Sequence, residues 1–207
     1  MPALSTAMRE GSRAEHEDAE GSTFISELLE GRIAEEGYAA YLRRLRGVYA
    51  ALETVVRERA GDPLVAAVHD PALERLTVID TDLDHWAPGV PHDLEPGESP
   101  ATEAYRARLH GATWGGDVVA HHYTRYLGDL SGGQAVGRVL SRTFDLRSSE
   151  GVRFFAFPEI PEVKPYKDCY RSRLDALPVD DAGRARMLEE VKVAFALNEA
   201  LLADLQP

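Results

Sequence analysis

Apolar residues recur at steps of three and four along most of the chain, the spacing that places side chains on one face of a helix. The longest run begins at Tyr38 and continues to Val56, and Gly61-Asp62-Pro63 stops it. The same spacing predicts helices over residues 3–20, 24–29, 73–86, 101–112, 165–177 and 181–205. No strand pair, repeat or low-complexity block is visible in the sequence, so the pattern predicts an all-α fold. At 207 residues, the chain is expected to form a single domain over residues 1–207.

Residues 116–143 predict one long helix whose middle contains three glycines, Gly128, Gly132 and Gly133. A glycine inside a helix costs roughly 0.5 to 1 kcal/mol relative to alanine. Three of them within six residues indicate that something approaches the backbone closely. They also predict a bend in the middle of this helix.

Two charged residues, Arg125 and Asp129, accompany these glycines. At about 100° per residue, they fall with the glycines on one arc of roughly 140°. The glycines alone are equally compatible with a close contact between two helices. The charges favour a flat ligand that lies on bare backbone beside a carboxylate and a guanidinium. A phosphate-binding loop is a different motif, because its glycines precede a helix and come with a lysine.

Two segments are expected to be loops. Residues 87–100 are rich in Pro, Gly and acidic residues, which is typical of a surface connection. Residues 145–161 contain the aromatic run Phe154-Phe155-Ala156-Phe157, which has no strand partner. We expect this second loop to pack on the core.

Composition narrows the classes of partner. The formal net charge of −12 disfavours nucleic acid and anionic membrane surfaces. The single cysteine, Cys169, excludes an internal disulfide and a cysteine metal cluster within one chain, which fits a reducing compartment. No apolar run approaches 18 residues, so we expect a soluble, cytoplasmic protein without a membrane anchor.

The histidines give no metal-binding pattern by spacing alone. His16 lies among acidic residues with Glu20 four positions later, which on its own predicts an ordinary surface residue. His121 and His122 point about 100° apart on a helix, so they are not expected to share one metal. The other histidines show no ligand spacing.

Other polar residues stand out within helices. Asn198 interrupts the apolar stripe of the last helix, where an amide without partners would cost a few kcal/mol, so it is expected to have partners. Lys167 and Arg171 are spaced i and i+4 and, on their own, predict solvated surface charges.

The segment Tyr-Leu-Gly-Asp-Leu-Ser-Gly-Gly-Gln, residues 126–134, resembles the signature of the heme oxygenases. Further similarity covers residues 9–24, 48–53, 166–174 and 194–198, so the resemblance spans nearly the whole chain. It implies a helical fold in which heme lies between a proximal N-terminal helix and a kinked, glycine-rich distal helix. It also implies cleavage of heme b, which is both substrate and cofactor, to biliverdin, with release of ferrous iron and carbon monoxide. The α isomer is expected.

The resemblance also implies roles for particular residues. His16 corresponds to the iron ligand, and Glu20 to the carboxylate that holds its other ring nitrogen. The propionate-binding groups correspond to Arg9, Tyr123, Lys167 and Arg171. Arg9 lies seven residues before His16, roughly 10 Å along a helix, about the distance from a heme iron to its propionates. The hydrogen-bonded distal network corresponds to Tyr49, Arg125, Asp129 and Asn198. The distal backbone corresponds to Gly128, Gly132 and Gly133, and the residues beside the ring to Phe195, Phe24 and Leu28.

The reaction needs O2 and electrons. No flavin or nicotinamide motif is present in the sequence, so the donor is expected to be external, a ferredoxin with its reductase or an NAD(P)H-dependent reductase. Two alternatives remain open: a heme carrier or storage protein on a similar scaffold, and a protein of related topology that binds no heme. A carrier has no evident use for Asp129 among the glycines.

Overall fold

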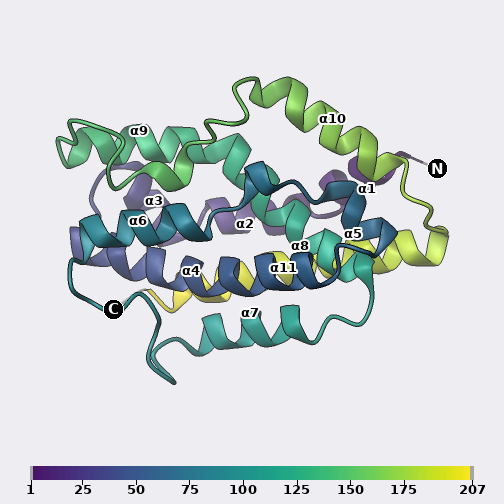
Figure 1. The fold of residues 1–207 in the computed structure, drawn as a ribbon, viewed down its shortest axis with the longest axis horizontal. Helices are drawn as coiled ribbons and strands as arrows, with labels where there is room; N and C mark the ends of the chain where they lie inside the picture. Colours follow the sequence, from purple (N-terminus) through teal and green to yellow (C-terminus); the bar gives the residue numbers. More distant parts are fainter. Residues whose placement is uncertain (1, 206–207) are drawn as a thin grey trace.

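The computed structural model describes residues 2–205. Within this span all regular secondary structure is helical, and turns and loops connect the helices without any strand (Figure 1). The predicted all-α class is therefore confirmed. In chain order the helices are α1 (Leu4–Gly11), α2 (Arg13–Glu20), α3 (Thr23–Leu29), α4 (Glu35–Glu58), α5 (Pro63–Val68), α6 (Leu76–Trp86), α7 (Pro100–His110), α8 (Gly115–Gly128), α9 (Gln134–Thr143), α10 (Val163–Asp175) and α11 (Asp181–Ala203). Shorter helical turns are η1 (Pro71–Leu73), η2 (Asp129–Gly133) and η3 (Arg153–Phe155).

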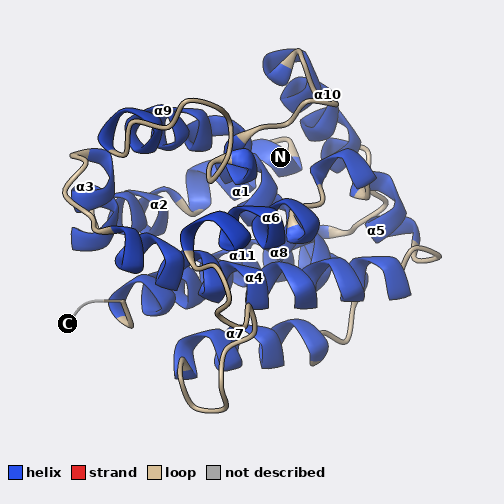
Figure 2. Ribbon diagram, turned by 60° about the vertical axis from the view of Figure 1, so that its left-hand side comes forward, coloured by secondary structure: helices blue, strands red, loops and turns tan. Residues whose placement is uncertain are grey.

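The core lies where α4, α8 and α11 meet the shorter helices α6 and α7. Helix α8 packs along α11, while α4 packs against α6, α7 and α8. Figure 2 shows α7 on the outside of this group and α10 at the opposite end of the molecule. Large aromatic side chains fill the interior, and Tyr38, Tyr49, Tyr105 and Phe154 are almost completely buried. The stripe that begins at Tyr38 is thus the buried face of α4.

The helix predicted over residues 3–20 is two helices in the structure. Ser12 separates α1 from α2, with φ −116° and ψ 19°, and its hydroxyl donates to the carbonyl of Met8 at 2.8 Å. Serine competes in this way for backbone groups, which explains why the hydrophobic pattern alone did not reveal the break. Because of this break, the two helices pack on different neighbours. Helix α1 packs on α10 and α11, whereas α2 packs on α11 and α3.

Helix α5 was missing from the predicted set. Asp62 caps it by accepting a hydrogen bond from the backbone N–H of Leu64 at 2.8 Å, and Pro63 occupies the first turn. The Asp-Pro pair is a typical helix start, although the sequence reading used it only as the end of α4. Helix α6 correspondingly begins at Leu76, and Leu73 belongs to the separate turn η1.

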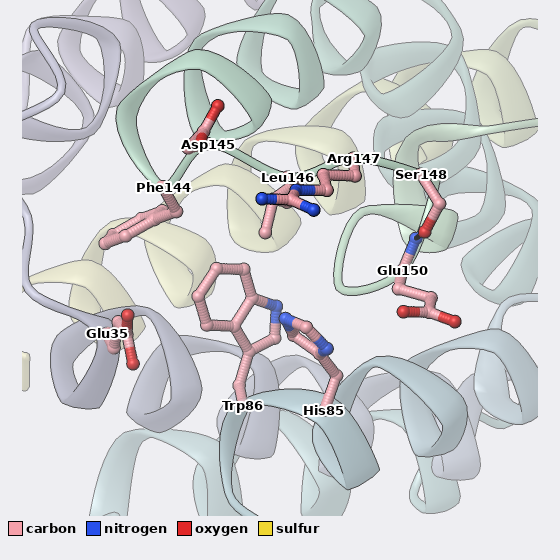
Figure 3. Close-up of a pocket in the computed structure, with 9 residues that line it drawn as sticks. All are labelled: Glu35, His85, Trp86, Phe144, Asp145, Leu146, Arg147, Ser148 and Glu150. Carbon is pink, nitrogen blue, oxygen red and sulfur yellow. Dashed lines mark hydrogen bonds between the residues drawn. The ribbon is translucent and has the colours of Figure 1, made fainter.

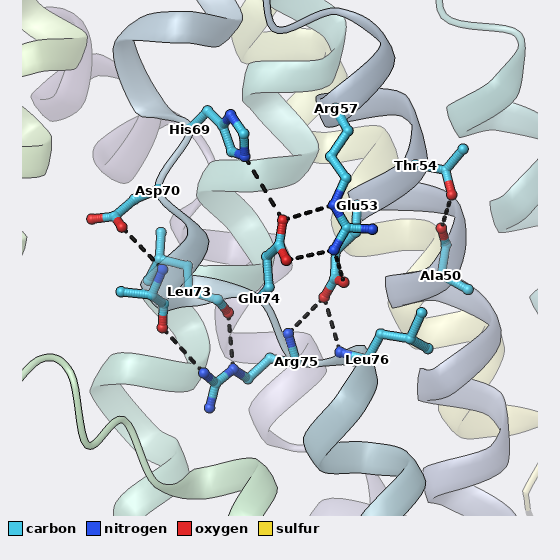
Figure 4. A network of polar contacts seen from close by, with 11 residues as sticks. Ala50, Glu53, Thr54, Arg57, His69, Asp70, Leu73, Glu74, Arg75 and Leu76 are labelled. Atoms are coloured by element: carbon cyan, nitrogen blue, oxygen red, sulfur yellow. Dashed lines mark hydrogen bonds and ion pairs between the residues drawn. The ribbon is translucent and has the colours of Figure 1, made fainter.

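A buried carboxylate joins α4 to the start of α6 (Figure 4). Glu53 accepts hydrogen bonds from the backbone N–H groups of Arg75 at 2.6 Å and Leu76 at 2.9 Å. Arg57 approaches the other oxygen of Glu53 at 3.4 Å and also pairs with Glu74. Burial raises the pKa of Glu53, and the two backbone hydrogen bonds oppose that rise. The carboxylate thus satisfies helix N–H groups that would otherwise lack partners.

The glycine-rich region is continuous with α8 and α9 but is not α-helical throughout. Residues Asp129–Gly133 form η2, a π-helical segment, between the two α-helices. Such segments insert roughly one extra residue into a helix and often occur at functional sites. The expected bend itself remains a prediction.

The two predicted loops are confirmed. The segment between α6 and α7 is held to α4 by Arg43, which donates to the carbonyls of Pro91 at 3.2 Å and Asp93 at 2.7 Å. In the loop after α9, Phe154, Phe155 and Phe157 are buried in the core, as expected from their aromatic character.

Candidate functional site

A cavity of about 540 Å³ opens among α1, α2, α8, η2, α10 and α11. This volume falls in the range of small-molecule sites, roughly 300 to 1,000 Å³. Most of the residues singled out in the sequence line it, namely Arg9, His16, Tyr123, Arg125, Gly128, Asp129, Gly132, Arg171, Phe195 and Asn198. Residues far apart in the chain therefore converge on one cavity.

Two glycines expose bare backbone to this cavity. A Cβ atom added to Gly128 or Gly132 would meet no other atom within 4 Å. Gly133 is placed differently: it does not line the cavity, and an added Cβ would lie 3.0 Å from the ring of Phe155. Gly137 also faces Phe155, at 3.2 Å. The glycines therefore lie on two different surfaces: Gly128 and Gly132 border the open cavity, and Gly133 packs closely on the core.

Four polar side chains form a hydrogen-bonded network beside Gly128 and Gly132. Tyr49 of α4 donates a hydrogen bond to Oδ2 of Asp129. Arg125 donates to the hydroxyl of Tyr49 at 3.2 and 3.3 Å and to Oδ1 of Asn198 at 2.5 Å. Its guanidinium also lies 3.8 Å from Oδ1 of Asp129. Asn198 therefore has the partner that a polar residue in an apolar stripe requires.

The surroundings of Asp129 and Tyr49 shift the pKa values of both side chains. Burial raises the pKa of Asp129, although the charge of Arg125 and the Tyr49 hydrogen bond oppose the rise. Burial also raises the pKa of Tyr49 well above its usual value, so its phenol keeps the proton that it donates. Because Tyr49 occupies Oδ2, Oδ1 of Asp129, which lies 3.8 Å from the guanidinium of Arg125, is the oxygen that can hold a water molecule or a proton.

His16 projects into the cavity from α2. Its ring lies edge-on to Phe195 of α11, with 5.7 Å between the ring centroids and 72° between the planes. The backbone of Glu20 belongs to α2, but its side chain lies outside the described part of the structure. The expected contact between this carboxylate and His16 stays a prediction.

Of the three predicted propionate-binding cations, Arg9 and Arg171 line the cavity and Lys167 does not. Arg9 and Arg171 line it, and each also pairs with a neighbouring carboxylate, Glu10 at 2.9 Å and Asp168 at 3.1 Å respectively. Lys167 is not among the lining residues, and its ammonium contacts the hydroxyl of Ser131 at 3.1 Å. Burial lowers the pKa of Lys167, and the nearby charge of Arg171 lowers it further.

Several lining residues were absent from the predicted site. Tyr41 lies on the same face of α4 as Tyr49, two turns earlier, and the sequence reading assigned its stripe entirely to the core. Ile25 lines the cavity, whereas Phe24 and Leu28 are buried in the core beside it. A helix that is buried on one side and borders a cavity on another shows a single apolar stripe, so spacing does not separate the two roles.

Neither buried histidine of α8 belongs to this cavity. His121 contacts Glu190 of α11 at 2.9 Å, and His122 contacts the hydroxyl of Tyr170 at 2.8 Å. Within residues 2–205, no group of three or more His, Cys, Asp or Glu side chains is arranged to hold a metal ion. A metal bound by His16 would therefore need most of its ligands from another molecule, as a metalloporphyrin provides.

A second, smaller cavity of about 370 Å³ lies near the ends of α6 and α9 (Figure 3). Glu35, Asp145 and Glu150 surround it together with Arg147. The adjacent Trp86 donates its indole N–H to the carbonyl of Gly151 at 2.7 Å. This cavity shares no residue with the first one.

Comparison with known proteins finds heme oxygenases similar to this chain in sequence and in fold. A family model described as heme oxygenase matches residues 2–204. The chain is 38% identical to human heme oxygenase 1 over 98% of its own length and 72% of that protein. It superposes with a TM-score of 0.90 on the heme oxygenase of Leptospira interrogans, at 33% identity, covering 98% of this chain and 99% of that one. For heme oxygenase-1 of Synechocystis in complex with heme, the TM-score is 0.92 and the identity 31%, covering 99% and 93% of the two chains. No helix within residues 2–205 has the length and apolar character needed to span a membrane.

Proposed function

Because the chain belongs to the heme oxygenase family, we propose that its larger cavity binds heme and that the enzyme cleaves the ring to biliverdin, ferrous iron and carbon monoxide. One observation carries the proposal. The imidazole of His16, two glycines with open space above them and a hydrogen-bonded carboxylate all line the same cavity.

The cavity has the side chains that heme requires. His16 supplies an imidazole for the iron, and Phe195 supplies an aromatic surface beside it. Gly128 and Gly132 leave room for a flat ring close to the backbone. Arg9 and Arg171 supply guanidinium groups for the two propionates, and Tyr123 adds a hydroxyl.

Bound heme would supply both the iron at which O2 is reduced and the ring carbon that is oxidised. The chain supplies the surroundings of that chemistry. The glycine backbone carries no side-chain donor or acceptor toward the ring face, so nothing there competes with the ring carbon. Asp129 would hold water at Oδ1, while Tyr49 and Arg125 fix its orientation. Asn198 fixes Arg125 in turn.

Two finer features belong to the same proposal. Arg9 and Arg171 approach the cavity from different helices, which favours one orientation of the propionates and hence a single product, the α isomer. Electrons would come from an external ferredoxin with its reductase or from an NAD(P)H-dependent reductase, because the sequence has no dinucleotide-binding motif.

The direct test is a hemin titration followed by turnover. We expect one equivalent of hemin to give a Soret band, and a chemical reductant with O2 to convert the complex to biliverdin with release of carbon monoxide. A heme complex that oxidises without ring opening would indicate a carrier. A chain that gives no Soret band would overturn heme binding itself.

A further inference from the structure

Helix α10 carries Lys167 and Arg171, yet it lies at the edge of the molecule (Figure 1). It packs mainly on the short helices α1 and α5. Its inward face consists of Tyr166, Tyr170 and Leu174, spaced four residues apart. The two cations each follow an inward tyrosine by one residue, so they project about 100° around the helix from that face. The direction of the cations therefore depends on how α10 is rotated about its axis.

The middle of the inward face is attached to α8 by two buried rings. The hydroxyl of Tyr170 lies 2.8 Å from Nδ1 of His122, and the two rings are stacked with 9° between their planes. Tyr170 is fully buried and His122 is 1% exposed. The residue after His122 is Tyr123, which lines the larger cavity. This ring pair thus links the back of α10 to the helix that forms the cavity wall.

Both rings are uncharged at physiological pH. Burial, together with the nearby charges of His69 and Arg173, lowers the pKa of His122 to about 3. Burial raises the pKa of Tyr170 well above its usual value. A protonated phenol beside a neutral imidazole can donate to Nδ1 in the tautomer that carries the imidazole proton on Nε2, and we adopt this arrangement for the pair. A hydrogen bond between two stacked, buried rings fixes direction as well as distance.

We propose that His122 is a positioning residue for heme: through Tyr170 it fixes the rotation of α10, and so the direction of Arg171 and Lys167 beside the cavity. This inference rests on the proposed function, because the cations matter through the propionates that they would hold. A helix with its side chains has a radius of about 5 to 6 Å, so a rotation of about 15° moves a side-chain tip by roughly 1.5 Å. That displacement is enough to break a hydrogen bond to a propionate.

Other polar contacts hold the ends of α10, while its middle has the buried ring pair and one exposed contact, from Lys167 to the hydroxyl of Ser131 at 3.1 Å. Asp175 accepts hydrogen bonds from the backbone N–H and hydroxyl of Ser5 at 2.7 and 3.0 Å. Near the other end, the hydroxyl of Tyr166 donates to Asp70 at 2.7 Å. Loss of the Tyr170 hydrogen bond should therefore loosen the rotation of α10 without detaching the helix.

The experiment uses Tyr170→Phe, which removes the hydroxyl and keeps the ring. The matched control is Tyr105→Phe, because the Tyr105 hydroxyl contacts Nδ1 of the adjacent His121 at 3.4 Å but belongs to α7. The first measurement is amide hydrogen exchange of the heme-free proteins, in peptides that cover residues 163–175. We expect exchange there to be about five to ten times faster in Tyr170→Phe and unchanged in the control, since one hydrogen bond contributes about a factor of that size.

The second measurement uses the hemin complexes. Tyr170→Phe should bind hemin more weakly and release a second biliverdin isomer, while the maximal rate of ring opening changes little. His122→Asn places an amide oxygen near the position of Nδ1 and should restore most of the wild-type isomer ratio, whereas His122→Ala should not. The control variant should give the wild-type ratio.

The outcomes separate the two proposals. Wild-type exchange over residues 163–175 in Tyr170→Phe would overturn the positioning role, whatever the ligand. Faster exchange with an unchanged hemin affinity and isomer ratio would overturn it as well. A wild-type protein that forms no hemin complex would instead overturn the proposed function, and with it the link to propionates.

Discussion

Tyr49 of α4 donates a hydrogen bond to Asp129 of η2, which joins the core to the π-helical segment of the cavity wall. The phenol is buried and stays protonated, and it occupies Oδ2 of the carboxylate. The position of Oδ1 is then limited by the same contact. A carboxylate on an interrupted helix would otherwise have freedom to rotate, so Tyr49 makes Asp129 a fixed group.

Replacing Asp129 with alanine should alter the chemistry more than the binding. The carboxylate pairs with Tyr49 and Arg125 and not with the proposed propionate-binding cations Arg9, Arg171 and Lys167, so we expect the hemin affinity of Asp129→Ala to stay within about threefold of wild type. Biliverdin yield should fall by roughly tenfold or more, because the ordered water is lost. Hydrogen peroxide should instead support oxidation of added phenols. Normal biliverdin yield without phenol oxidation would leave Asp129 a purely structural role.

Replacing His16 with alanine should remove the iron ligand and preserve the fold. The side chain is exposed and projects into the cavity, so the melting temperature of the heme-free protein should change little. Hemin should still bind weakly, with an altered Soret band and no turnover, and added imidazole should restore part of the activity. A variant with the wild-type spectrum and full activity would exclude His16 as the ligand.

Arg171 and Lys167 should contribute unequally to product selection. Arg171 lines the cavity, whereas Lys167 does not and instead contacts the lining residue Ser131. Arg171→Glu should therefore weaken hemin binding and give mixed biliverdin isomers, with a smaller effect for Lys167→Glu. Chromatography of the products measures both. Equal effects would mean that Lys167 reorients toward the ligand, and an unchanged product from the double variant would exclude a cationic clamp.

Two alanine substitutions should separate the two surfaces of the glycine cluster. Gly128→Ala places a methyl group in open cavity space, so stability should rise by up to about 1 kcal/mol while hemin binding and turnover fall. Gly133→Ala brings a Cβ within 3.0 Å of Phe155, so it should be less stable than Gly128→Ala by about 1 kcal/mol or more. Chemical denaturation and hemin titration distinguish the two. The reverse order of stability would contradict this assignment.

Acid stability should depend on Glu190, which joins α11 to α7 and α8. Burial alone would raise its pKa, but hydrogen bonds from Arg108 and His121 lower the pKa to about 2, below its ordinary value of 4.5. A lowered native pKa stabilises the fold above about pH 4.5, and that contribution disappears as the pH falls through 2. Glu190→Gln should lower the free energy of unfolding by about 2 kcal/mol at pH 7. The difference from wild type should shrink steadily below pH 4.5.

The sequence predicted the helices and loops well because their apolar spacing is long and regular. It did not predict the break at Ser12, since a side-chain hydrogen bond to a carbonyl leaves no trace in hydrophobic spacing. It also missed α5, which has only six residues and too few turns to show a period. Short elements defined by capping groups are therefore the ones that spacing overlooks.

For the site, the sequence indicated which polar residues need hydrogen-bond partners. It did not indicate which glycines face the cavity and which face the core. Asn198 illustrates the first point, because its place in an apolar stripe predicted a partner, and the structure supplies Arg125. Gly133 illustrates the second, since it lies next to Gly132 in the chain yet packs on Phe155. The face that a glycine presents depends on the π-helical segment, whose hydrogen bonding follows from tertiary packing.

The π-helical segment also has a consequence for chain length. Because η2 holds roughly one residue more than an α-helix of the same rise, everything after it is turned by about 100° relative to an uninterrupted helix. Deleting one residue from Asp129–Gly133 would let α8 continue smoothly into α9, but it would rotate Gly137 away from Phe155 and a bulkier side chain toward it. The number of residues in the segment is therefore constrained as well as the identities of Asp129 and Gly133, because a change in length would turn all of α9 against the core.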